Sequence, residues 1–128
     1  MTVMPRTLII AAALFAALGI ISGAFGAHAL KGMLDGAQQG WFQKAVHYHQ
    51  LAALGALLMA LVARQPSPAD ASNGWILLLG ASIFSATLYT MALGGPRWLG
   101  AVTPIGGSLM IFAWGRLAWQ FFWSIDDE

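Results

Sequence analysis

Long apolar stretches alternate with short polar segments along the whole chain. Apolar runs extend over residues 7–27, 45–63, 75–93 and 103–123. Each run is close to the ~20 residues that a helix needs to cross a hydrocarbon core of about 30 Å. Backbone groups in lipid must be hydrogen-bonded within the protein, and nothing in the pattern alternates like the strand of a β-barrel. The pattern therefore predicts four transmembrane helices.

The polar segments predict where these helices begin and how they connect. Asp35 followed by Gln38 is typical of a capping box, so we expect the second helix to begin there, ahead of the membrane. Residues 64–74 have the composition of a solvated loop, and residues 94–102 that of a short turn. The Thr103–Pro104 pair is expected to be the N-cap and first-turn residue of the last helix.

These boundaries define the expected fold. Residues 1–128 should form a single all-α membrane domain, a polytopic antiparallel bundle of four transmembrane helices. The second helix should enter the membrane at about residue 45. The expected helices are residues 7–27, 36–63, 75–93 and 103–123.

The composition agrees with a chain that lipid surrounds. Of 128 residues, 59% are hydrophobic and 9% are charged, whereas soluble domains are about 25% charged. We therefore expect the lipid bilayer to be the main partner. The absence of cysteine excludes disulfides, thiolate metal sites and a catalytic cysteine. The few cations form no basic patch for nucleic acid, which is not an expected partner.

The first apolar stretch has a second interpretation. A charged start, an apolar run and the sequence Ala27-His28-Ala29 are together typical of a cleaved signal peptide. However, the run is longer than the ~7–15 residues of a signal-peptide core. It also carries a regular row of small residues, so we expect it to be retained as a transmembrane helix.

Small residues recur at helical spacing within the predicted helices. Lipid gives helices no hydrophobic reason to associate, so close backbone contact through small residues must supply the packing. The first helix has a row spaced four, three, four and three residues apart, and the last helix begins near a glycine pair. The expected packing residues are Ala12, Ala16, Gly19, Gly23, Gly26, Gly106 and Gly107.

Polar residues near the helix ends gather on one side of the predicted bundle. We call face one the side with the N-terminus, the 64–74 loop and the C-terminus. Face two is the side with the 28–44 connection and the 94–102 turn. Face two holds a candidate polar cluster made of His28, Gln43, His47, His49, Tyr89, Arg97 and Thr103.

One polar row on the second helix has two interpretations. Gln39, Gln43, His47 and Gln50 are four, four and three residues apart, which puts them on one side of a helix. The row either dips into the bundle, where it would form a small cavity with other members of the cluster, or faces water and headgroups at the membrane rim.

Three histidines raise the question of a metal or haem. His47 and His49 are two positions apart and point to nearly opposite sides of a helix, and metal-binding spacings are absent. We expect no metal and no cofactor. A haem protein or enzyme that uses His28 and His47 is the weakest of the interpretations.

Arg116 is the one charge inside an apolar stretch. A charge within a membrane is costly and suggests a function. Its stem is long enough, however, to extend to the interface beside Trp119 and Trp123, and we expect it to do so. The alternative is a partner on face one, either Asp70 or the acidic tail at residues 126–128.

Three segments resemble one known family. They are Gly23-Ala-Phe-Gly-Ala-His-Ala-Leu-Lys31, Trp41-Phe-Gln-Lys-Ala-Val-His-Tyr48 and Leu99-Gly-Ala-Val-Thr-Pro-Ile-Gly-Gly107. They are similar to segments of domain of unknown function 423, also called the transmembrane protein 256 family, and the similarity covers nearly the whole chain. The resemblance implies a small multi-helix protein of the bacterial inner membrane, or of a eukaryotic membrane, without an established activity or agreed site residues.

Together these features favour a structural or interaction component of the membrane, one that associates with itself or with another membrane protein. The alternative is a carrier of a small molecule, proton or ion that uses the face-two cluster. Catalytic motifs are absent, so an enzyme is not expected. The 6 Lys and Arg residues divide equally between the two faces, so the orientation is not predicted.

Overall fold

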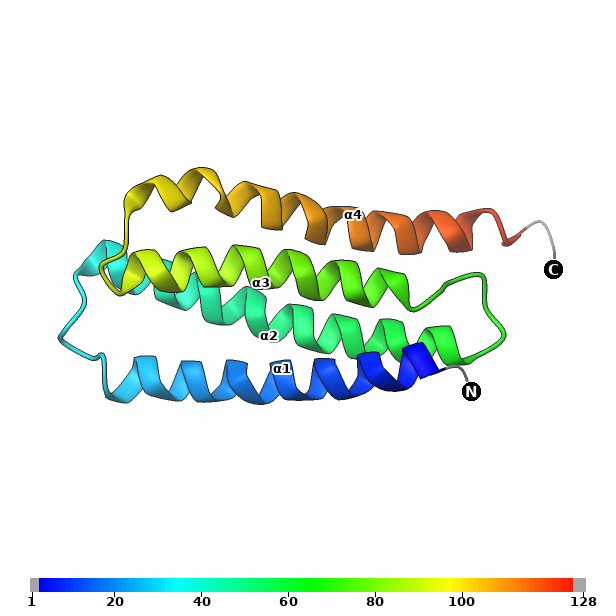
Figure 1. Ribbon diagram of the computed structural model, residues 1–128, viewed down its shortest axis with the longest axis horizontal. Coiled ribbons are helices and arrows are strands. Elements are labelled where there is room, and N and C mark those ends of the chain that lie inside the picture. Colours follow the sequence, from blue (N-terminus) through cyan, green and yellow to red (C-terminus); the bar gives the residue numbers. More distant parts are fainter. Residues whose placement is uncertain (1–2, 126–128) are drawn as a thin grey trace.

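The computed structural model describes residues 3–125, and four long helices account for most of them (Figure 1). Within this range there is no strand, and each long helix is apolar and long enough to cross a membrane. The predicted all-α fold with four spans is therefore confirmed. In chain order the elements are α1 (Val3–His28), α2 (Gly36–Arg64), α3 (Ser72–Ala92), the short 3-10 helix η1 (Arg97–Ala101) and α4 (Thr103–Phe122).

The helices run side by side in antiparallel fashion, with α2 and α3 between α1 and α4 (Figure 1). The extensive contacts are those of α1 with α2, α2 with α3, and α3 with α4. In the apolar window of α3, 50% of the residues are buried, against 17% in α1 and 22% in α4. The outer faces of α1 and α4 therefore meet lipid, while α2 and α3 supply most of the core.

Close backbone contact joins α3 to α4. A Cβ on Gly80 would lie 2.7 Å from the carbonyl oxygen of Gly106, and a Cβ on Gly106 would lie 2.5 Å from the backbone nitrogen of Phe84. Neither position tolerates a side chain without movement of the backbone. Gly107 is different, because a Cβ there would make ordinary contact with the Phe84 ring at 3.6 Å.

The start of α2 follows the prediction. The side chain of Asp35 accepts a hydrogen bond from the backbone N–H of Gln38 (2.8 Å), and the Gln38 side chain accepts one from the backbone N–H of Asp35 (3.0 Å). This is the reciprocal pairing of a capping box. The capping box is therefore confirmed.

The predicted N-cap of the last helix is wrong. Thr103 is already the first residue of α4, and Val102 before it has helical dihedral angles (φ −85°, ψ −32°). The 3-10 helix η1 leads directly into α4, so the chain is already turning when it reaches Thr103. Its hydroxyl therefore donates to the carbonyl of Leu99 (3.1 Å) and also lies 2.7 Å from the hydroxyl of Thr87 on α3.

At face one, a polar clamp holds the loop before α3 against α4. Arg116 of α4 forms a two-point ion pair with Asp70, at 3.1 and 3.2 Å. It also donates to the hydroxyl of Ser72 (2.5 Å) and to Oδ1 of Asn73 (2.8 Å). Asn73 is fully buried and donates to Oε1 of Gln120 (2.6 Å). Arg116 is therefore held by protein groups rather than only extended to the interface.

The polar clamp also favours the charged form of the Asp70 carboxylate. Hydrogen bonds from Arg116 and Ser72 lower the pKa of Asp70 from 3.8 to about 2. Asp70 lies in the loop between α2 and α3, outside the spanning helices. The sequence had suggested two alternative partners for Arg116. Asp70 is one of them, and the other, the acidic tail, lies outside the described residues.

We expect Gly106→Ala to destabilise the fold, because the added methyl group meets the backbone of α3. Overpacking of this kind costs about 1–3 kcal/mol. Unfolding of the purified protein in mixed micelles measures the loss. Gly115→Ala is the control, since a Cβ there meets open space, and it should keep the stability or raise it slightly through the higher helix propensity of alanine. Equal stability of the Gly106→Ala protein and the wild type would contradict the close α3–α4 contact.

The Asp70 ion pair predicts a specific response to acid. Because folding lowers the pKa of Asp70, its stabilising effect is fully present above pH 3.8, weakens below that, and is lost as the pH falls through about 2. In this window the melting temperature of the wild type should fall more steeply than that of Asp70→Asn, which has no carboxylate to protonate. At neutral pH the variant should be the less stable protein. Parallel curves for the two proteins would show that the clamp has no such effect.

Candidate functional site

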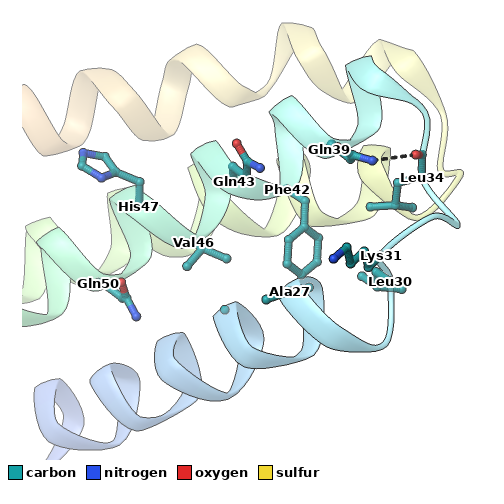
Figure 2. A pocket seen from close by; sticks show the side chains of 12 residues that line it. Ala27, Leu30, Lys31, Leu34, Gln39, Phe42, Gln43, Val46, His47 and Gln50 are labelled. Atoms are coloured by element: carbon teal, nitrogen blue, oxygen red, sulfur yellow. Dashed lines mark hydrogen bonds between the residues drawn. The ribbon is translucent and has the colours of Figure 1, made fainter.

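A polar cleft opens at face two between the C-terminal half of α1 and the N-terminal half of α2 (Figure 2). Its volume is about 460 Å³. The polar row predicted on the second helix lines this cleft, and within residues 3–125 it forms no hydrogen bond with Tyr89 or Thr103. The polar side chains that line the cleft are Lys31, Gln39, Gln43, His47 and Gln50.

Glycines on α1 give the cleft its shape. The Phe42 ring of α2 occupies the place that a side chain on Gly26 would take, and Val46 lies against Gly23. Figure 2 shows Phe42 and Val46 extending from α2 toward α1, whereas Gln43 and His47, at the rim of the cleft, project away from α1. The two apolar side chains therefore form a floor that separates the polar rim from the interior.

Most of the polar groups in the cleft have no hydrogen-bond partner among the residues that the structure describes. Gln39 donates through Nε2 to the carbonyl of Leu34 (3.0 Å). Within residues 3–125, the side chains of Gln43, His47 and Gln50 form no hydrogen bond. These donors and acceptors are therefore free to bind water, lipid headgroups or a ligand.

His49 lies on a different side of α2, inside the protein, with 6% of its surface exposed. Its Nε2 is 2.8 Å from the carbonyl oxygen of Phe15 on α1, and its Nδ1 is 3.1 Å from the hydroxyl of Tyr89 on α3. A carbonyl can only accept, so Nε2 carries the proton, and in the neutral ring Nδ1 accepts from Tyr89. His49 therefore connects three helices, and both of its ring nitrogens are occupied.

Three other members of the predicted cluster lie apart from these two places. The guanidinium of Arg97 is 5.7 Å from the centre of the Trp41 ring. Thr103 is buried against Thr87, and His28 is exposed at the end of α1. The structure therefore does not bring the seven candidates together: Gln43 and His47 share the cleft, and His49 and Tyr89 share the interior.

Three polar residues of the cleft, Lys31, Gln39 and Gln50, lie outside the candidate cluster, although both glutamines belong to the predicted polar row. Lys31 follows α1 in the loop and lines the cleft. The sequence signals for Lys31 were its position on face two and its place at the end of the Gly23–Lys31 segment. For the part of the chain that the structure describes, no group of three His, Asp or Glu side chains is arranged to hold a metal ion.

Comparisons with known proteins give the chain its family. The family model described as "Protein of unknown function (DUF423)" matches residues 22–107, which include every residue of the cleft. A UPF0382 membrane protein of Staphylococcus haemolyticus is 39% identical over 109 residues, which cover 85% of this chain and 89% of that protein.

Two further relatives come from well-known bacteria. The UPF0382 membrane protein YwdK of Bacillus subtilis is 34% identical over 111 residues, covering 85% of this chain and 90% of the relative. The UPF0382 inner membrane protein YgdD of Escherichia coli is 35% identical over 115 residues, covering 88% and 86%. No solved structure matches the chain. With four helices able to span a bilayer, this chain belongs to the DUF423 family of small integral membrane proteins, whose function is unknown.

Proposed function

We propose that this protein is an interaction component of the membrane that binds a negatively charged polar group in the α1–α2 cleft. The observation that supports the proposal is a set of side chains with no hydrogen-bond partner in the described part of the chain, namely Gln43, His47 and Gln50 beside Lys31. Lys31 offers a positive charge, and the amides offer N–H donors. A carboxylate or phosphate group, on a small molecule or on a neighbouring membrane protein, matches this chemistry.

The charges around the cleft support an anionic ligand. The lining contains one lysine and no carboxylate. Asp35, at the start of α2, uses its side chain in the capping box. An anion in the cleft would therefore meet a cation and free N–H groups without a repelling carboxylate in the lining.

A carrier is less well supported than a binding protein. Below the polar rim, Phe42 and Val46 lie on the glycines of α1. Beyond His49, the inward face of α2 is apolar and includes Ala52, Ala56 and Ala60, all buried in the core. This arrangement favours binding at one face over movement of a polar substrate from one face to the other.

Most of the glycines that the sequence predicted for helix packing lie against neighbouring helices of this chain. Gly19, Gly23 and Gly26 lie against α2, and Gly106 lies against α3. We therefore assign partner binding to the cleft. We also propose the bacterial inner membrane as the location, because the Escherichia coli relative is named an inner membrane protein.

The proposal predicts saturable binding of simple anions. In nanodiscs of neutral lipid, the side-chain amide signals of Gln43 and Gln50 in nuclear magnetic resonance spectra should shift with added phosphate or acetate. Removal of the charged partner in Lys31→Gln should weaken this binding about tenfold, because a hydrogen bond to a charged group contributes about 1.5–3 kcal/mol. Lys44→Gln, which removes a cation outside the lining of the cleft, is the matched control and should bind like the wild type. No saturable shift with either anion, or equal affinity in Lys31→Gln, would rule the proposal out.

A further inference from the structure

An apolar groove lies on the other side of α2, between α2 and α4 and across α3. Its volume is about 330 Å³. Tyr48 supplies the only hydroxyl in its lining, and the Tyr48 ring lies against Phe84 with their centres 4.9 Å apart. The groove is therefore apolar, with the Tyr48 hydroxyl as its one polar side-chain group. Its principal lining residues are Tyr48, Leu51, Leu77, Phe84, Ile111 and Trp114.

Trp114 bounds the groove toward face one, and Tyr48 bounds it toward face two. Toward face one, Trp114 lies on Gly55, where a Cβ would come within 2.6 Å of the indole ring. Toward face two, the slot ends at Tyr48, which lies nearer to the start of α2 than Gly55 does. Gly107 keeps the slot open beside Phe84, since it has no side chain to fill it.

Two cations lie beyond the Tyr48 end of the groove, toward face two, and neither belongs to its lining. Lys44 precedes Tyr48 by four residues and follows Trp41 by three, so all three lie on one side of α2. Arg97 has its guanidinium 5.7 Å from the centre of the Trp41 ring. Both cations are exposed, and neither forms an ion pair within residues 3–125, where the one ion pair is that of the face-one clamp.

We infer that this groove is a binding site for an anionic phospholipid. One acyl chain lies in the slot between α2 and α4, and the phosphate lies near Lys44 and Arg97. The two unpaired cations select a headgroup with net negative charge, because each cation near an anionic surface favours binding electrostatically. Trp41 and Tyr48 are the amphipathic rings that proteins place at headgroup level. The site lies on the opposite side of α2 from the α1–α2 cleft, so it does not depend on the proposed function.

Native mass spectrometry of the protein released from micelles tests this inference. The probes are phosphatidylglycerol and phosphatidylcholine with identical acyl chains. The wild type should bind the anionic lipid about tenfold more tightly, and Lys44→Gln combined with Arg97→Gln should abolish that preference. Lys31→Gln removes a cation of the same face from the other side of α2, and it should keep the preference.

A second variant tests the slot itself. Gly107→Leu can be accommodated, since its Cβ makes only ordinary contact with Phe84, but its side chain fills the groove. It should weaken the binding of both lipids severalfold. Equal affinity of the wild type for the two lipids would overturn the inference. So would an unchanged preference in the double variant, or a loss in Lys31→Gln as large as that in the double variant.

Discussion

Hydrogen bonds between neighbouring helices hold this protein together in a solvent that gives helices no hydrophobic reason to associate. The central bond is that of His49, whose ring joins α2 to a carbonyl of α1 and to the hydroxyl of Tyr89 on α3. Ser85 of α3 donates to the carbonyl of Ala45 on α2 (2.8 Å), and the hydroxyls of Thr87 and Thr103 join α3 to α4. Each neighbouring pair is thus joined by a polar contact.

These contacts decide which surfaces are left for binding. His49 holds α1 close to α2, and the glycines of α1 then allow Phe42 and Val46 to form the floor of the cleft. On the other side of α2, Gly107 and the position of Trp114 on Gly55 leave an apolar slot. The polar cleft and the apolar groove therefore share one helix and one face of the membrane. They differ in chemistry because α2 has different residues on its two sides.

Local sequence patterns predicted the elements well, since hydropathy determines a membrane span and Asp35 with Gln38 determines a helix start. The period of the helix also placed Gln43 and His47 on one side of α2 and His49 on another. The pattern could not say which neighbour each side meets, because that depends on packing between distant segments. Of the polar row, only Gln50 therefore lies against a glycine of α1, and Arg116 pairs with Asp70 instead of only extending to the interface.

The most direct test of this account measures how closely α1 lies against α2. The chain has no cysteine, so a pair introduced by Gly23→Cys and Val46→Cys is the only one that can form a disulfide. A Cβ on residue 23 lies 3.3 Å from the Val46 side chain, which predicts rapid disulfide formation in native membranes. The additional change His49→Leu removes both hydrogen bonds of the ring and should slow this reaction severalfold. A pair that does not crosslink, or a rate that His49→Leu leaves unchanged, would contradict the account.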